Sequence, residues 1–126
     1  LLPPLDAAAP ALVEALQQKG LLERTMVVIS GEFGRTPTVN KQAGRDHWPR
    51  ANWTLVAGGG VKAGQLIGGT DPHGHGPDDA TRLKPDDVAA SIYRALGIDH
   101  RIEYHTKTGR PVILVQNGDP IGGLFA

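Results

Sequence analysis

Two short stretches of the sequence hold side chains whose types suit metal and anion chemistry. The first contains the carboxylate of Glu32 and the guanidinium of Arg35, shortly after an apolar run. The second contains Arg45, Asp46 and His47. Carboxylate oxygens and imidazole nitrogens are common ligands of divalent cations, and guanidinium groups bind anionic oxygens through paired N–H donors. Brought together, these residues suit a metal-assisted site for an anionic substrate.

Each of these residues also has an ordinary structural interpretation. Glu32 is either a metal ligand or general base, or a solvated loop carboxylate that pairs with Arg35. His47 is either a metal ligand that Asp46 orients or joins, or a loop histidine stacked on the neighbouring tryptophan. Arg35 and Arg45 either clamp a phosphate or sulfate group or form surface ion pairs. The residue types alone leave both interpretations open.

Two further patterns invite a functional interpretation that we do not favour. His73 and His75 have the spacing of a metal-binding pair, but they lie in a predicted loop without a cysteine or further histidine at ligand spacing. The glycine run 58–60 is followed by Lys62 and then alanine, so it lacks the Gly-Lys-Ser/Thr of a phosphate-binding loop. Because the next segment is predicted to be extended, the run does not match a dinucleotide-binding fingerprint either.

The composition bounds the size and class of the protein. At 126 residues, of which 40% are hydrophobic, the chain suffices for one domain at most, with a modest core. Its 13 basic and 13 acidic residues cancel, which argues against a nucleic-acid binder. No apolar run approaches the roughly 20 residues that span a bilayer. The first residue is Leu1 and not methionine, so we expect a piece of a longer protein.

Hydrophobic periodicity predicts helices and strands in alternation. The predicted helices are 6–20, whose regular part begins at Ala9 or Pro10, and 85–96. The predicted strands are 26–29, 53–57, 65–67 and 111–115. The run 26–29 is continuous and rich in β-branched residues, as in a strand buried on both faces. A helix that leads into such a strand is half of a βαβ unit, so we predict an α/β fold whose site lies beyond the strand ends.

Three motifs resemble those of one protein family. They are GEFGRTP at 31–37, GRDHWP at 44–49 and the glycine turn AGGG at 57–60. These motifs resemble the alkaline-phosphatase-like family catalogued as domain of unknown function 1501, and the helix 86–96 is similar to the last helix of sulfatases. The resemblance implies an α/β fold, with 1–126 as the C-terminal portion of an αβα sandwich of the alkaline-phosphatase-like type. It also implies a nucleophile upstream of Leu1 and export to the periplasm or beyond.

The resemblance assigns roles to individual residues. In the alkaline-phosphatase superfamily, a strand ends in a Ser-Asp-His-Gly type motif whose Asp and His bind metal. The matching segment here is 30–34, so Glu32 stands in the place of the aspartate and Phe33 in the place of the histidine. Phenylalanine cannot coordinate a cation, so this segment lacks one ligand. His47 resembles the later histidine ligand, and the implied cofactor is a divalent ion such as zinc, manganese or calcium.

Two functions follow from these observations. The first is a metal-dependent hydrolase-like protein acting on phosphate or sulfate esters, either small anionic esters or sulfated or phosphorylated glycans. In it, Glu32, Asp46 and His47 would hold the metal ion, and Arg35 and Arg45 would orient the anionic group. The second is a non-catalytic secreted binding or surface protein that keeps the scaffold, which the phenylalanine in place of a ligand favours. A fold alone does not choose between them.

Overall fold

The computed structural model describes residues 2–125. Over that range the α-helices are α1 (Leu2–Gln18) and α2 (Pro85–Ala95), and the 3-10 helices are η1 (Leu22–Arg24) and η2 (Asp79–Thr81). Three separate antiparallel ribbons pair β1 (Val27–Ser30) with β4 (Thr54–Ala57), β2 (Gly34–Arg35) with β3 (His47–Trp48), and β5 (Glu103–His105) with β6 (Pro111–Ile113).

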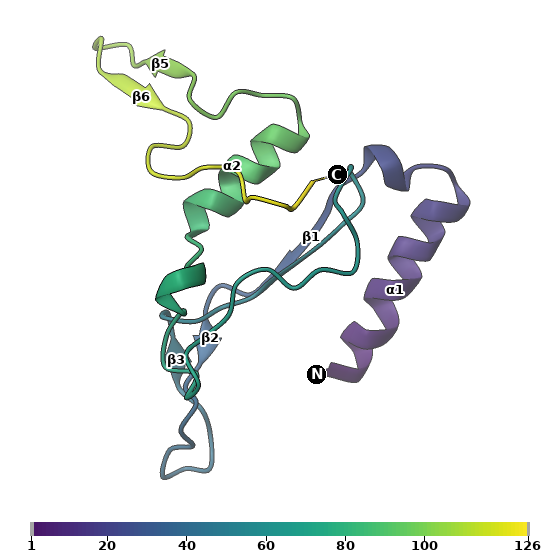
Figure 1. The fold of residues 1–126 in the computed structure, drawn as a ribbon, viewed down its shortest axis with the longest axis vertical. Coiled ribbons are helices and arrows are strands. Elements are labelled where there is room, and N and C mark those ends of the chain that lie inside the picture. The colour runs from purple at the N-terminus through teal and green to yellow at the C-terminus, as the bar shows by residue number, and fades with distance from the viewer. Residues whose placement is uncertain (1, 126) are drawn as a thin grey trace.

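The arrangement of these elements is open. In Figure 1, α1 lies along one side, β1 runs through the middle, and the β5–β6 ribbon forms the end farthest from the β2–β3 ribbon, with α2 between the two ribbons. The mixture of helices and small ribbons agrees with the predicted α/β class. The αβα sandwich of the alkaline-phosphatase-like type stays a prediction. No helix within residues 2–125 is both long and apolar enough to cross a membrane.

Helix α1 begins earlier than predicted. We expected its regular part to begin at Ala9 or Pro10, because proline cannot donate the helical hydrogen bond, but Pro10 lies inside the helix. The prolines at 3–4 occupy the first turn, where the missing N–H groups have no intrahelical partner in any case. Alanines on both sides of Pro10 have the highest helix propensity and continue the helix. The predicted stop is confirmed, since the helix ends just before Gly20, whose φ is 64°.

The two predicted strands 26–29 and 53–57 form the β1–β4 ribbon, within one residue at each end. Val28 pairs with Val56 and Ile29 with Leu55 across the ribbon. The prediction that β1 is buried on both faces is wrong, because its residues alternate between half-buried and exposed. Within residues 2–125, β1 has a single neighbouring strand, and alternation is the pattern of a ribbon with one covered face.

The shorter elements differ from prediction. Residues 65–67 form no strand: Leu66 is 95% exposed, and the Gln65 amide donates to the carbonyls of Lys62 (3.0 Å) and Gly123 (2.9 Å). The predicted strand 111–115 is confirmed over its first three residues, where β6 pairs with the unpredicted β5. The ribbon β2–β3 was also not predicted, because two residues are too few to show a period.

Helix α2 lies where the sequence predicted it and anchors the C-terminal tail. The C-terminal tail crosses α2 in Figure 1. Within the helix, Ala90 and Ser91 are 0% and 1% exposed. The Asp87 carboxylate accepts a hydrogen bond from the amide of Asp119 (3.1 Å) and another from that of Lys84 (2.8 Å). The Ser91 hydroxyl accepts one from the amide of Ile121 (2.9 Å). The tail is therefore fixed through two buried polar side chains of α2.

The chain buries little hydrophobic surface. Among residues 2–125, the buried hydrophobic side chains are those of Ala90, Val115 and Leu124. The exposed area is 9402 Å², whereas a compact protein of 13.3 kDa exposes roughly 6,500 Å². Large side chains such as Trp53 and Leu55, 51% and 45% exposed, account for part of the difference. Most of the structure is therefore held by local pairing, not by a shared core.

Candidate functional site

The two motif stretches fold against each other as one hairpin. In the register of β2 and β3, Gly34 lies opposite Trp48 and Arg35 lies opposite His47. A Cβ added to Gly34 would collide with the Ala51 carbonyl, so the chain needs glycine there. Side chains directly opposite each other in an antiparallel pair project from the same face. The hairpin thus places a guanidinium beside an imidazole, two of the residue types on which the sequence prediction relies.

Phe33 forms the platform on which these two side chains rest. Its ring stacks on the His47 ring, with centroids 3.7 Å apart and planes 26° apart. The Arg35 guanidinium carbon lies 5.4 Å from the centroid of the same Phe33 ring, within cation–π range. Stacking covers one face of the imidazole and leaves the nitrogens at its edge. Phe33 therefore orients His47, the histidine that the sequence predicts to be a metal ligand.

Asn40 organises the loop between the two strands. Its side-chain oxygen accepts hydrogen bonds from the amides of Gln42 (3.0 Å) and Gly44 (2.9 Å), and its nitrogen donates to the Asp46 carboxylate (2.8 Å). Ala43, with a φ of 57°, makes the left-handed turn that brings the chain back. The predicted site residue Asp46 is thus held by a side chain that sequence reasoning missed. Asparagine is a common turn residue because its side chain bonds backbone groups about two residues further on, and this is the sequence signal that points to such a role.

The two predicted arginines also hold the hairpin together. Arg35 donates to the Arg45 carbonyl (3.1 Å), and Arg45 donates to the carbonyls of Thr36 (2.7 Å) and Pro37. Each guanidinium has five N–H donors, and the bonds to the hairpin backbone use one nitrogen of each. Both arginines therefore have a structural role at the base of the loop and keep donors for an anionic ligand.

The carboxylates of the predicted site, unlike Arg35 and His47, are not paired with each other in the ribbon. Glu32 is exposed and precedes β2, in a turn where the Asn52 amide donates to the Gly31 carbonyl (2.6 Å). Within residues 2–125, no group of three or more His, Asp or Glu side chains is close enough to hold a metal ion. The structure thus places Arg35 opposite His47 in the ribbon, and it does not gather Glu32, Asp46 and His47 into such a cluster.

A third segment, the loop 71–76, packs against the hairpin. The Trp48 indole nitrogen donates to the His75 carbonyl (2.9 Å), and a Cβ on Gly74 would contact Pro37 at 3.7 Å. Inside the loop, the Asp71 carboxylate accepts hydrogen bonds from the amides of His73 (2.8 Å) and His75 (3.1 Å). Sequence reasoning separated this loop from the two motifs. The Asp-Pro-x-Gly pattern predicts the turn but not its place beside the hairpin.

The hydrogen bonds to Asp71 change its acidity. The backbone N–H of His75 has the largest effect and lowers the pKa of the Asp71 carboxyl below its ordinary value of 3.8. The N–H groups of His73 and Gly76 lower the pKa further, and partial desolvation opposes them. Hydrogen bonds to the ionised form favour that form, so Asp71 is a carboxylate at neutral pH.

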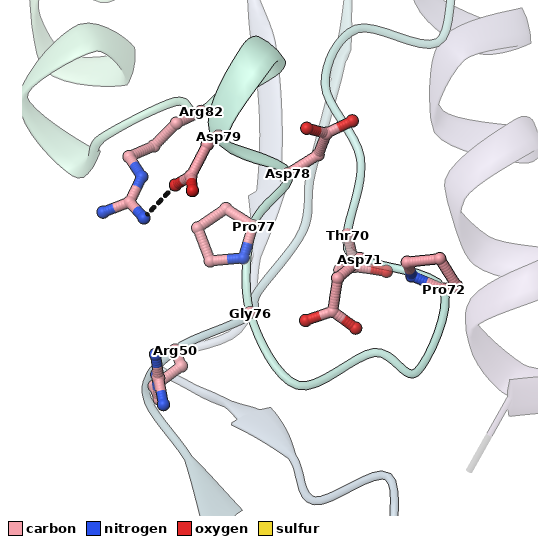
Figure 2. A pocket seen from close by; sticks show the side chains of 9 residues that line it. All are labelled: Arg50, Thr70, Asp71, Pro72, Gly76, Pro77, Asp78, Asp79 and Arg82. Carbon is pink, nitrogen blue, oxygen red and sulfur yellow. Dashed lines mark hydrogen bonds and ion pairs between the residues drawn. The ribbon is translucent and has the colours of Figure 1, made fainter.

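A polar cavity of about 570 Å³ adjoins this loop. Figure 2 shows the carboxylates of Asp71 and Asp78 on its walls, with Arg82 hydrogen-bonded to Asp79 at 2.6 Å and Arg50 below them. Three carboxylates and two guanidinium groups line it, and one of the guanidinium groups is paired internally. Its lining is therefore slightly acidic and is a poorer match for an anionic ester than the arginine-bearing hairpin.

Comparison with known proteins gives one positive result. The profile of the family described as Protein of unknown function (DUF1501) matches residues 1–125, which is nearly the whole chain. No curated protein and no solved structure matches the chain significantly.

Proposed function

The chain belongs to the DUF1501 family, and from that premise we propose that it forms part of a metal-dependent, hydrolase-like protein acting on phosphate or sulfate esters. The observation that supports the proposal best is the pairing of Arg35 with His47 across one hairpin. An imidazole for a cation next to a guanidinium for an anion is the combination that an ion-assisted ester site requires. The substrates we propose are small anionic esters or sulfated or phosphorylated glycans.

The donor set suits a divalent ion in part. Glu32 and His47 would be its ligands from this chain, with Asp46 as a further ligand or as the group that orients His47. Because the described residues gather no group of three, water, ester oxygens or other protein groups would fill the remaining positions. When bound, the ion would polarise the ester and activate the attacking oxygen.

The chain's own residues would bind and orient the substrate. Arg35, held over Phe33, would direct its remaining N–H donors at the non-bridging oxygens of the phosphate or sulfate group. Arg45, at the base of the loop, would supply a second cation and restrict the approach of the ester. Phe33 would fix the plane of His47 and exclude water from one face of the ring. Such fixed donors stabilise developing charge without reorganisation during the reaction.

A turnover assay tests this proposal. The full-length protein, loaded in turn with zinc, manganese or calcium, is tested on aryl phosphates and aryl sulfates. We expect metal-dependent hydrolysis that falls at least a hundredfold in His47→Ala and in Glu32→Ala, while bound metal falls in step. His105→Ala, a change of an exposed histidine away from the hairpin, serves as the matched control and should leave both unchanged. Folded protein without turnover under any metal would contradict the proposal.

A second function is favoured by one observation, the stack of Phe33 on His47. In a non-catalytic binding protein of the same scaffold, an aromatic ring in place of a ligand would leave the hairpin as a recognition surface for sulfated or phosphorylated glycans. The Phe33→His variant separates the two. Tighter metal binding and increased turnover would support a hydrolase, whereas unchanged metal content with undiminished glycan binding would support the binding protein.

A further inference from the structure

The loop 71–76 presents two imidazoles on a backbone that is already ordered. The Asp71 carboxylate accepts hydrogen bonds from the amides of His73 and His75, the Asp71 amide donates to Gly76 (3.0 Å), and the Gly74 amide donates to the Asp71 carbonyl (3.0 Å). Trp48 ties the loop to the hairpin through the His75 carbonyl. These bonds use the backbone of both histidines and leave their rings exposed to solvent.

The two rings are separated by a distance that suits a shared ion. Their centroids are 5.8 Å apart, and their planes are tilted by 36° and not stacked. A metal–nitrogen bond of about 2.0–2.1 Å places an ion about 3 Å from each ring centre, so two rings that share it lie about 5–6 Å apart. The observed separation falls in this range before any metal arrives.

Although the sequence alone did not favour a metal pair here, the ring separation changes that interpretation. We propose that His73 and His75 form a two-imidazole site for a transition-metal ion, with copper(II) bound most tightly and zinc less tightly. Imidazole nitrogens suit these metals, whereas magnesium and calcium prefer oxygen ligands. The ordered loop lowers the entropic cost of bringing two ligands to one ion. Water fills the remaining coordination positions, so this is an open site. It is separate from the residues proposed for ester hydrolysis and does not depend on that function.

Trp48 provides an internal probe of the site. Its indole is hydrogen-bonded to the His75 carbonyl, and copper(II) bound nearby quenches indole fluorescence. The full chain is titrated with copper(II) while Trp fluorescence is followed, and with zinc by calorimetry. We expect saturation at one ion per chain, at least tenfold weaker binding in His73→Ala and in His75→Ala, and unchanged affinity in His105→Ala. Trp48→Phe should remove most of the quenching and leave the calorimetric signal.

Three results would overturn the proposal. They are binding that does not saturate, binding that persists at full strength when both loop histidines are replaced, and binding that is lost in His47→Ala but not in the loop variants. Because the side chains of His73 and His75 take no part in the loop's hydrogen bonds, the alanine variants should keep the fold. His73→Gln and His75→Gln, which keep polar side chains of similar length, serve as second variants if circular dichroism shows a change. Loss of binding in these folded variants supports the site.

Discussion

The hairpin of the candidate site and the helix that anchors the C-terminal tail hold their shapes by different means. In α2, Ala90 and Ser91 are buried, and the tail amides bond to the largely buried side chains of Asp87 and Ser91. In the hairpin, no residue from 31 to 49 is buried, and its hydrogen bonds are mostly exposed. An exposed hydrogen bond contributes less than a buried one, whose loss leaves an unsatisfied polar group.

This difference separates the part of the molecule that holds the fold, α2 and the tail, from the hairpin that carries the candidate site. Segments with few buried contacts open locally at low free energy, and binding loops are drawn from such segments. Substitutions of the arginines and the histidine of the hairpin should therefore have small effects on global stability. Changes at α2 act on folding first and on any function only through it.

The largest effect is expected where the tail meets α2. Replacing Asp87 by alanine leaves the amides of Lys84 and Asp119 without their buried acceptor, so we expect a loss of about 3 kcal/mol of unfolding free energy. Chemical denaturation measures it. Asp86→Ala is the matched control, because Asp86 lies in the same helical turn and contributes mainly through the helix dipole, about 0.3–1 kcal/mol. Equal losses in the two variants would contradict the anchoring role of Asp87.

A smaller and local effect is expected in the hairpin loop. Asn40→Ala removes the acceptor of the Gln42 and Gly44 amides, and we expect the loop to open more easily by about 1 kcal/mol. Hydrogen exchange should quicken at Gly44, while the global unfolding midpoint stays nearly constant. Gln42→Ala, in the same loop, should change neither quantity. A large fall in global stability in Asn40→Ala would remove the contrast with α2.

The loop 71–76 should respond to acid. Because the pKa of Asp71 is lowered in the folded chain, its ionised form stabilises the loop, fully above its ordinary value of 3.8. This contribution is lost as the pH falls below 3.8 through the folded pKa. The amide signal of His75 in an NMR titration should report the change at acidic pH. Asp71→Asn should abolish this titration step; a step that persists in the variant would assign it to another group.

The smallest effect is expected at the ion pair of the cavity wall. Arg82 and Asp79 are 2.6 Å apart, but their side chains are 56% and 89% exposed. Exposed pairs contribute roughly 0–1 kcal/mol, so Arg82→Ala should lower the unfolding free energy by at most about 0.5 kcal/mol. A thermal melt in low and high salt checks this. A loss as large as that of Asp87→Ala would show that the cavity wall is a structural element.

The elements with a clear hydrophobic period were predictable from the sequence. Helix α2 has its proline at the first position, an apolar stripe and a terminal glycine, and β1 and β4 are apolar runs of ordinary strand length. The ribbons β2–β3 and β5–β6 have only two or three residues per strand, too few for a period to show. The start of α1 was misjudged because proline weighed more in the prediction than the alanines around it.

The residues of the candidate site were chosen from the sequence, whereas their surroundings were not predictable from it. Glu32, Arg35, Arg45, Asp46 and His47 stand out by type, and we expected the two motif stretches to come together, though not as the β2–β3 ribbon that pairs them. That Phe33 would support His47 depends on a stacking geometry that sequence spacing does not encode. The approach of the loop 71–76 to the hairpin includes a long-range hydrogen bond from Trp48 to His75, which no local sequence pattern predicts.

The ribbon β1–β4 has a consequence for handling the isolated polypeptide. Within residues 2–125 this ribbon has only two strands, so each strand leaves one row of amide and carbonyl groups without a partner in the ladder. Val28 and Leu55 add apolar surface beside these rows. Other extended peptides can add to such edges, and so can further molecules of the same chain. Concentrated solutions of the isolated chain should therefore polymerise by strand addition, and sedimentation at increasing concentration would reveal it.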